Sequence, residues 1–171
     1  MIDLLILYIL TKRDFTMYAI HKHIIENFGI YTNPSFGAVK PALVRLEQQE
    51  CITTTKVMSE GGRLSIIYSI TKSGEKVLKE LLLNPLSKNP LQFFSDSRIK
   101  LACSDVLNKE EKEELFNEIT TKALLHKIKA EKILDSEYID KTQTQSILLK
   151  NTIEDFDNIV KLIDTELKNV I

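Results

Sequence analysis

The first half of the sequence carries basic side chains that could neutralise the phosphates of a nucleic acid. They are Lys12, Arg13, Lys22, Lys40, Arg45, Lys56 and Arg63. Each phosphate contact releases condensed counterions, so binding through these residues would weaken steeply as salt rises. The alternative is an ordinary solvated surface, because residues 1–84 hold ten Lys and Arg against eight Asp and Glu, a net charge of +2. Charge alone leaves the two interpretations about equal.

Residues of the types that catalyse reactions or bind metals are present, but they do not form a catalytic or a metal-binding motif. The sequence has no Gly-rich phosphate loop, nucleophile elbow, HExxH motif or Cys-x-x-Cys pair. His21 and His23 would point to different sides of a helix, and His126 stands apart from both. Cys51 and Cys103 are best interpreted as small buried hydrophobes, because a reactive thiolate needs a cationic neighbour or a helix N-terminus. We expect no enzyme activity, no metal site and no cofactor.

Length and composition indicate a globular protein. The chain has 171 residues, of which 43% are apolar and 27% charged, with a formal net charge of -1. This is enough for one ordinary domain or two small ones. The apolar opening MIDLLILYIL contains Asp3, and it is too short to span a membrane, which takes ~20 apolar residues. It also lacks the preceding positive charge of a secretory signal. We expect a cytoplasmic protein that does not contact a membrane.

The two halves of the sequence follow different patterns. All 5 glycines and all 4 prolines lie at or before Pro90, and no helix breaker follows. Residues 85–171 carry a net charge of -3. The segment NPLSKNP at residues 84–90 is therefore the expected junction between a mixed domain at residues 1–84 and a helical domain at residues 85–171.

Apolar spacing predicts two helices on either side of a polar loop, TKRDF. The apolar face of the first helix consists of Ile2, Leu5, Ile6 and Ile9. Thr16 is suited to cap the second helix, and Gly29 is suited to end it in the left-handed conformation. The apolar face of the second helix consists of Met17, Ile20, Ile24 and Phe28.

A third helix is predicted after the loop IYTNPS. Its buried stripe is Phe36, Val39, Leu43 and Leu46. Its outward positions are Pro41, Val44, Arg45 and Gln48. Because a proline inside a helix removes a hydrogen bond and crowds the preceding turn, Pro41 should lie within the first turn or two.

A change of period then predicts a β-hairpin. The runs ITTTKVMS and LSIIYSIT are rich in β-branched residues, and the EGGR between them offers glycines that tolerate positive φ. Alternation is clearest in the second run, at Ile66, Tyr68 and Ile70. Thr71 should cap a fourth helix with an apolar face of Val77, Leu78, Leu81 and Leu82.

Three helices followed by a hairpin is the order of a winged helix-turn-helix domain. The runs MYAIHKHI and SFGAVKPALVRLEQQECI, and the GGR turn leading to YSITKSGEKVL, resemble the N-terminal domain of the PadR family of transcriptional regulators. In that family the third helix carries Gly-x-Leu-Tyr-Pro-x-Leu-x-x-Leu, and the second wing strand ends Tyr-x-Leu-Thr before a Gly. The resemblance covers residues 2–84. This sequence differs in having Lys40 where the family usually has Tyr, and Cys51 where the exit from the third helix usually has Gly.

The resemblance implies a homodimer that binds operator DNA, with repression as the expected mode of action. Family members often respond to small aromatic compounds, so an effector of that kind is a further expected partner. The expected DNA-binding residues are Ser35, Lys40, Arg45, Gln48, Lys56 and Arg63. Arg45 is expected to contact a base, while Lys40 and Arg63 hold phosphates. The alternative is a winged-helix module for protein–protein contact that does not bind DNA.

The second half predicts a helical arm. LQFFSDSRIKLACSDVL forms a short amphipathic helix, and Asn108 with Glu111 forms a capping box that opens a long one. The apolar positions of the long helix are Phe116, Ile119, Ala123, His126, Ala130 and Ile133. Within this seam His126 could fix the register of packing.

The last helix carries three heptads with both seam positions filled. Its seam residues, which we expect to form the dimer interface, are Leu149, Ile153, Phe156, Val160, Ile163 and Leu167, followed by Val170. The neighbouring helix of the same chain is an alternative partner for this seam, with Ile159 and Leu162 widening the stripe. The sequence as a whole therefore predicts a mostly α protein with a small β-hairpin wing and a coiled-coil-like C-terminal dimerisation arm.

Overall fold

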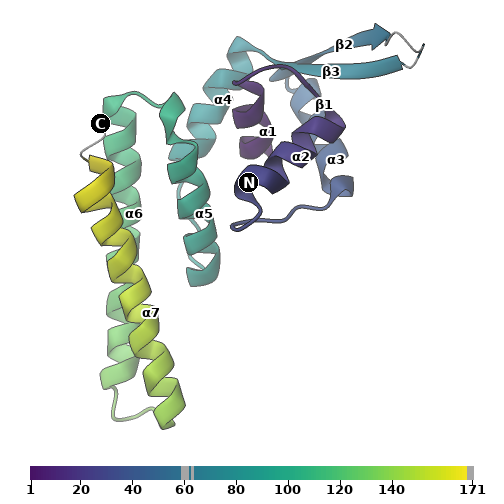
Figure 1. The fold of residues 1–171 in the computed structure, drawn as a ribbon. Coiled ribbons are helices and arrows are strands. Elements are labelled where there is room, and N and C mark those ends of the chain that lie inside the picture. The colour runs from purple at the N-terminus through teal and green to yellow at the C-terminus, as the bar shows by residue number, and fades with distance from the viewer. Residues whose placement is uncertain (59–61, 63, 169–171) are drawn as a thin grey trace. The chain divides into compact units, whose positions relative to one another are not determined.

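A computed structural model describes residues 1–58, 62 and 64–168 of the chain. Figure 1 follows the elements along the chain. They are α1 (Ile2–Leu10), β1 (Phe15–Thr16), α2 (Met17–Phe28), α3 (Phe36–Gln48), β2 (Ile52–Met58), β3 (Leu64–Ile70), α4 (Lys72–Leu83), α5 (Pro90–Ala102), η1 (Ser104–Val106), α6 (Lys109–Asp135), α7 (Gln143–Lys161) and the π-helical η2 (Leu162–Leu167). The predicted fold class, a winged helix-turn-helix with C-terminal helices, is confirmed. Among the described residues, no helix is both long and apolar enough to cross a bilayer.

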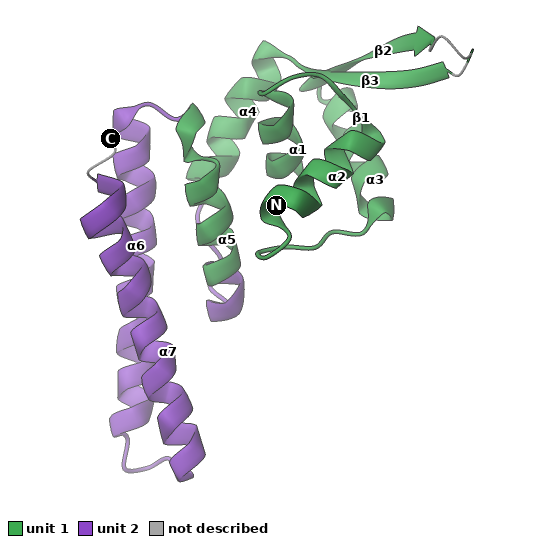
Figure 2. Ribbon diagram, viewed as in Figure 1, with its two compact units in different colours: residues 1–84, 94–106 green, residues 85–93, 107–171 purple. Residues whose placement is uncertain are grey.

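The chain divides into two compact units, coloured separately in Figure 2. Unit 1 consists of residues 1–84 and 94–106, and unit 2 of residues 85–93 and 107–171. The sequence predicts one boundary near residue 84, whereas in the structure residues 94–106 also belong to unit 1. In that segment Ile99 and Cys103 are fully buried, and the Ser95 hydroxyl donates to the Tyr31 carbonyl at 2.7 Å. The helix α5 thus contributes residues to both units.

The core of unit 1 is built around α1, which is apolar on almost every side. Its buried residues are Leu4, Leu5, Ile6, Leu7, Ile9 and Leu10. The prediction of a single apolar face was too narrow, because α1 packs against α2, α3, α4 and β3. A helix surrounded in this way is hydrophobic all round.

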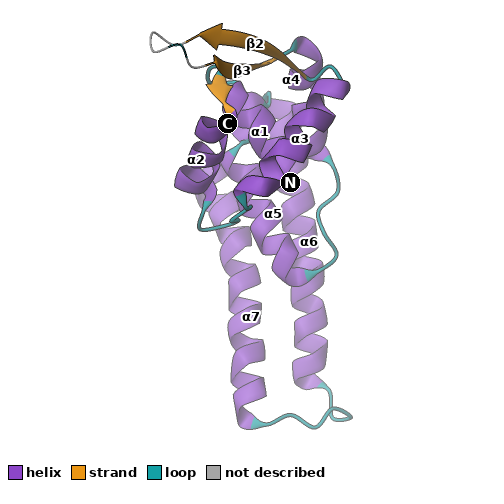
Figure 3. Cartoon of the chain, turned by 90° about the vertical axis from the view of Figure 1, so that its right-hand side faces the viewer, coloured by secondary structure: helices purple, strands orange, loops and turns teal. Residues whose placement is uncertain are grey.

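The wing sheet contains a strand that the sequence analysis missed. The predicted hairpin of β2 and β3 is confirmed, with Thr54 opposite Tyr68. Within TKRDF, however, Phe15 pairs with Tyr68 as part of β1, giving the antiparallel order β1-β3-β2 seen in Figure 3. The prediction that TKRDF is only a loop was wrong at its last residue. A strand of two residues is too short to show alternation.

The N-caps predicted for two helices of unit 1 are present. The hydroxyl of Thr16 accepts from the Ala19 amide at 3.3 Å, and that of Thr71 accepts from the Gly74 amide at 3.0 Å. The left-handed end predicted at Gly29 was wrong, because Gly29 has φ -59 and is right-handed. The chain continues there as a tight turn in which the Tyr31 amide donates to the Phe28 carbonyl.

The buried stripe of α3 is confirmed at Val39, Leu43 and Leu46. Its first predicted member, Phe36, is instead 43% exposed. This residue lies in the first turn of α3, and its ring meets the edge of His21 with centroids 5.3 Å apart. Pro41 lies in the second turn, as expected.

The exit from α3 is a tight turn made by Glu50, the one non-glycine residue with positive φ (55°) in the described part of the chain. The amides of Glu50 and Cys51 donate to the carbonyls of Glu47 and Leu46. This pattern is a Schellman motif with Glu50 in the left-handed position. The turn therefore does not need a glycine at Cys51, which is buried instead.

In unit 2, α6 and α7 run side by side (Figure 3). The predicted capping box of Asn108 and Glu111 is present, and Thr142 with Gln145 forms a second one that the sequence analysis missed. The seam of α6 is buried as predicted except for Ile133, which is 42% exposed. Leu115 is buried beside the seam.

The seam of α7 is used mainly within the chain itself. Phe156 and Ile163 are buried, as is Ile159, and the Phe156 ring stacks on His126 of α6 at 5.4 Å. The other four predicted dimer residues, Leu149, Ile153, Val160 and Leu167, are only half-buried. The alternative prediction, in which this seam packs on the neighbouring helix of the same chain, is confirmed for Phe156. Val170 lies outside the described residues.

Candidate nucleic-acid interface

The exposed face of α3 is the first candidate surface for nucleic acid. Its centre is formed by residues spaced 4-3-4, which a helix of 3.6 residues per turn places on one side. These residues are Gly37, Pro41, Val44 and Gln48, all of them exposed. Gln48 is the member of this row with a polar side chain that could donate to and accept from a base edge.

Lys40 and Arg45 flank this row on opposite sides. Lys40 shares its side with Glu47, whose carboxylate accepts from the Thr54 hydroxyl of β2 at 2.8 Å. That hydrogen bond ties α3 to the wing. Lys40 is exposed, and its position on the helix places it on the wing side of the exposed row.

Arg45 is engaged within unit 1. Its Nε donates to Asp3 Oδ2 at 3.1 Å, and its Nη2 donates to Asp3 Oδ1. The guanidinium is therefore partly neutralised by the first turn of α1. Sequence periodicity placed Arg45 correctly on the exposed side of α3 but could not reveal this partner, which lies 42 residues away in the chain.

The remaining predicted contacts lie at the start of α3 and on the wing. Ser35 is the N-cap of α3, is exposed, and makes no side-chain capping hydrogen bond. Lys56 is exposed on β2, opposite Ile66 of β3. Arg63 lies outside the described residues. The structure thus presents Lys40 and Gln48 on the exposed side of α3 and Ser35 exposed at its N-cap, next to a wing strand that carries Lys56.

The described part of the wing is more apolar than a phosphate-binding surface requires. Met58 and Leu64 lie opposite each other in the hairpin and are 69% and 57% exposed. Ile66 and Val57 are also exposed. Apart from the alternation that includes Ile66, nothing in the sequence assigns these side chains a role.

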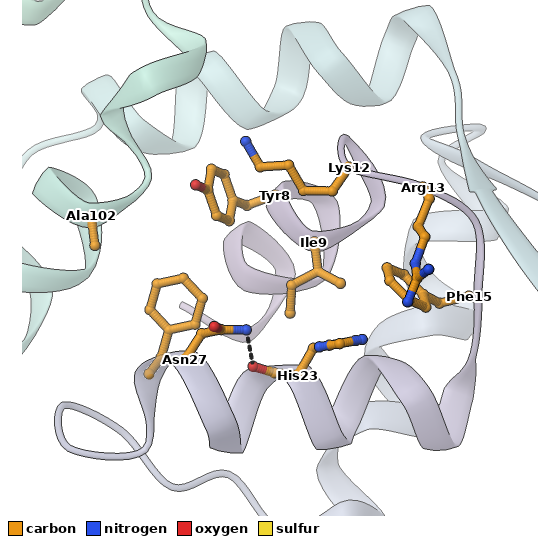
Figure 4. Close-up of a pocket in the computed structure, with 9 residues that line it drawn as sticks. Tyr8, Ile9, Lys12, Arg13, Phe15, His23, Asn27 and Ala102 are labelled. Carbon is orange, nitrogen blue, oxygen red and sulfur yellow. Dashed lines mark hydrogen bonds between the residues drawn. The ribbon is translucent and has the colours of Figure 1, made fainter.

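A second candidate site is a pocket of about 490 Å³ within unit 1, shown in Figure 4. It is lined by Tyr8, Ile9, Lys12, Arg13, Phe15, His23, Asn27, Phe28 and Ala102. The sequence alone marks Lys12 and Arg13 as possible phosphate contacts and predicts no pocket around them. The available signal was Tyr8, an aromatic residue with a polar hydroxyl in an opening helix whose other residues, apart from Asp3, are apolar.

The cations of the pocket lie against its aromatic rings. The Lys12 ammonium is 4.6 Å from the Tyr8 ring centroid, and the Arg13 guanidinium is 4.6 Å from that of Phe15. Lys12 also donates to Asp105 of η1 at 2.6 Å, and this hydrogen bond raises the pKa of Lys12. Burial, followed by a hydrogen bond to Asp105, raises the pKa of Tyr8. The phenol therefore stays protonated at neutral pH.

Within the described part of the chain, no group of three or more His, Cys, Asp and Glu side chains is placed to hold a metal ion. Both cysteines are buried. Burial raises the pKa of Cys51 and that of Cys103, which favours the unreactive thiol over the thiolate.

Comparison with known proteins assigns the family of this winged helix. Residues 6–80 match the transcriptional regulator PadR-like family. The winged-helix domain therefore belongs to the PadR-like family. The members of this family are described as transcriptional regulators, not as enzymes. No match was found among curated proteins.

Several solved structures are similar to this chain. Bacillus subtilis PadR in complex with operator DNA is 18% identical, with 98% of this chain and 96% of that chain covered and a TM-score of 0.45. The same protein in complex with p-coumaric acid is 19% identical, with 98% and 97% covered and a TM-score of 0.44. The protein smu.1604c from Streptococcus mutans UA159 is 24% identical, with 97% and 98% covered and a TM-score of 0.46.

Proposed function

We propose that this PadR-like protein is a cytoplasmic transcriptional repressor that binds operator DNA as a homodimer. One observation carries the proposal: the exposed face of α3 lies beside the wing strand β2, to which Glu47 and Thr54 tie it. A helix exposed in this way can enter the major groove, while the neighbouring wing contacts the backbone. Membership of a family of transcriptional regulators supports the same function.

The proposed contacts fall into two kinds. Gln48, at the C-terminal end of the exposed row, is suited to pair with an adenine edge. Lys40, Lys56 and Ser35 are suited to phosphates, which fix the position of the protein on the duplex without reading sequence. We extend the phosphate role to Arg63, which lies outside the described residues. Arg45 can contact a base or phosphate only by giving up part of its interaction with Asp3.

The proposed dimer uses the exposed apolar side chains of the C-terminal helices. On α6 these include Leu125 and Ile128, which are 53% and 45% exposed. On α7 they include Ile147 and Leu148, each 59% exposed. A dimer with two-fold symmetry would present two α3 helices to successive major grooves, so the operator should be an inverted repeat with half-sites about 34–36 Å apart.

A second function, protein contact through the wing, is favoured by the exposed apolar residues there. Met58 and Leu64 form an exposed cross-strand pair, which is unusual on a surface that faces only water or phosphate. In this alternative α3 would not enter DNA, and the wing would dock on another protein.

Fluorescence anisotropy with a labelled DNA fragment from upstream of the gene separates the two functions. A DNA-binding protein should bind this fragment more tightly than random DNA, and its affinity should fall steeply with salt. Lys40→Ala should weaken both kinds of binding and reduce the slope of log affinity against log salt by about 0.9. Gln48→Ala should reduce only the preference for the fragment, by about 1–3 kcal/mol.

Lys76→Ala, on the exposed surface of α4, is the matched control for loss of one positive charge. It should leave both affinities unchanged if α3 is the DNA-binding surface. Binding that has no salt dependence, or that responds equally to Lys40→Ala and Lys76→Ala, would contradict the proposal. Loss of function in Met58→Ser with normal DNA binding would favour the protein-contact alternative.

A further inference from the structure

We infer that Met58 and Leu64 of the wing form an apolar wedge that enters the minor groove of the bound DNA, partly unstacks a base step and bends the duplex. The inference rests on the proposed function, because it needs α3 in the adjacent major groove. It gives a role to wing side chains that cannot bind phosphates, and it makes the deformability of the DNA part of sequence recognition.

The wedge lies on the face of the wing that carries the contact with α3. Side chains at every second position of a strand share a face, and so do residues directly opposite each other in an antiparallel pair. Thr54 uses this face to donate to Glu47 of α3. Lys56 and Met58 follow Thr54 at steps of two and therefore lie on the same face. Leu64 lies opposite Met58, in a hairpin that projects away from the helices of unit 1 (Figure 1).

The spacing of residues along β2 matches the spacing of the DNA grooves. An antiparallel strand advances about 3.4 Å per residue, so Lys56 lies about 7 Å and Met58 about 14 Å beyond Thr54. The centres of neighbouring major and minor grooves are half a helical turn apart, roughly 17 Å along the axis. With α3 in the major groove, Lys56 can therefore reach the intervening phosphates, and Met58 can reach the minor groove beyond them.

The chemistry of the pair suits a groove wall better than water. Met58 is 69% and Leu64 57% exposed, and Ile66, the next residue of β3 on the same face, is 43% exposed. Leucine and methionine are among the side chains that minor-groove proteins insert between base steps. Burying their apolar surface against sugars and bases offsets part of the cost of unstacking.

The size and surroundings of the patch favour DNA over a protein as its occupant. A stable protein interface takes about 20–30 residues from each side, whereas in the described part of the wing this face exposes three large apolar side chains. Lys56 is exposed on the same face, between the α3 contact and the wedge. A cation next to an apolar pair complements the minor groove, because phosphates border that groove on both sides.

Bending of the fragment from upstream of the gene tests the inference with the full chain. Footprinting locates the bound site, and a short duplex that contains it carries an energy-transfer donor and acceptor at its two ends. The natural chain should shorten the end-to-end distance as a bend of about 20° or more would. 2-Aminopurine at one step within the footprint should brighten, because its fluorescence rises when it is unstacked. Specific binding with neither signal would overturn the inference.

The double variant Met58→Ser with Leu64→Ser should lose both signals and bind the fragment about 10-fold more weakly. Val57→Ser is the matched control, because Val57 is 45% exposed on the opposite face of β2, and it should leave bending unchanged. The exchange Met58→Leu with Leu64→Met keeps the apolar volume and should retain the bend. Equal bending by the natural chain and the double serine variant, or equal loss in Val57→Ser, would contradict the wedge.

The DNA provides a test that needs no variant to fold. At the step where 2-aminopurine brightens, a flexible TA step should be bound about 3-fold or more tightly than a stiff AA step, because TA unstacks more easily. Lys40→Ala should keep this preference, since Lys40 is proposed to contact phosphate. Equal affinity of the natural chain for the TA and AA duplexes would rule out insertion at that step.

The outcomes separate the inference from the proposed function. A chain that binds the upstream fragment no better than random DNA would overturn the proposed function, and the wedge with it. Specific, salt-dependent binding to an unbent duplex would overturn the wedge alone. Normal bending by the double serine variant, together with loss of repression in cells, would overturn the wedge and favour protein contact through the wing.

Discussion

The carboxylate of Asp3 on α1 accepts two hydrogen bonds from the guanidinium of Arg45 on α3, one of them from Nε at 3.1 Å. The side chains are 24% and 47% exposed. This pair joins the buried central helix of unit 1 to the helix that we propose enters DNA, and it lowers the positive charge that α3 presents to phosphates.

Asp3→Asn should therefore increase affinity for DNA. The substitution removes a negative charge and releases the Arg45 guanidinium, which can then contact a phosphate. The slope of log affinity against log salt should become steeper by about 0.9. Anisotropy titrations at several salt concentrations measure this, and the double variant Asp3→Asn with Arg45→Ala should lose the gain. Unchanged affinity in Asp3→Asn would show that Arg45 does not reach DNA.

Substitutions in the exposed apolar face of α6 should dissociate the proposed dimer. Leu125→Glu and Ile128→Glu each place a charge in an interface where it would lose its hydration. Light scattering at micromolar concentration should report a monomer with unchanged helix content. Lys129→Glu, also exposed on α6, is the control for added negative charge. Ile163 is unsuited to this test, since it is already buried within the chain.

Glu50→Gly should stabilise unit 1. A non-glycine residue at φ 55 carries a steric cost of roughly 1–2 kcal/mol that glycine avoids. Part of that gain is lost to the greater freedom of glycine in the unfolded chain, so we expect an increase of about 1 kcal/mol in the free energy of unfolding, measured in urea. Gln49→Gly, at the neighbouring position with a negative φ of -86, should destabilise, because glycine has more freedom in the unfolded chain. A loss of stability in Glu50→Gly would contradict the steric account.

Gly74→Ala should destabilise the start of α4. An added Cβ would lie 2.0 Å from the Cys51 carbonyl oxygen and 2.9 Å from Ile70 Cγ1, so the backbone at the exit of α3 would have to move. Overpacking of this kind costs about 1–3 kcal/mol or more. Gly37→Ala is the matched control, because its Cβ would meet only the Ser35 hydroxyl at 4.0 Å. Urea unfolding of both variants should show a large loss for Gly74→Ala and little change or a gain for Gly37→Ala.

His126 should make the stability of unit 2 depend on pH. It is buried between the rings of Phe93 and Phe156. Burial, with smaller contributions from Lys129 and Lys122, lowers the pKa of His126 below 6.5. The unfolded chain therefore binds a proton near pH 6.5 that the folded chain does not, and stability should fall as the pH drops from about 6.5 toward the folded pKa.

Thermal unfolding followed by circular dichroism between pH 8 and pH 5 measures this effect. His126→Phe keeps a ring between Phe93 and Phe156 but cannot be protonated. It should therefore lose the part of the pH dependence that lies just below pH 6.5. A variant with the same pH profile as the natural chain would show that His126 is not responsible.

The features that the sequence determined are those set by neighbours in the chain. Periodicity located α3 and the hairpin, and the caps at Thr16, Thr71 and Asn108 followed from residue type, because a side-chain oxygen caps an amide only three residues away. The exposed side of α3, with Val44, Arg45 and Gln48, followed from the same periodicity.

The tertiary structure decided what depends on residues far apart in the sequence. Asp3 meets Arg45 across 42 residues, and Lys12 meets Asp105 across 93. Periodicity marks which side of a helix is apolar but not which surface covers it, so it could not assign Phe156 to its own chain or to a partner. Only the packing of α7 on α6 placed that ring against His126. The pocket beside Tyr8 likewise exists only once α1, β1 and α2 come together.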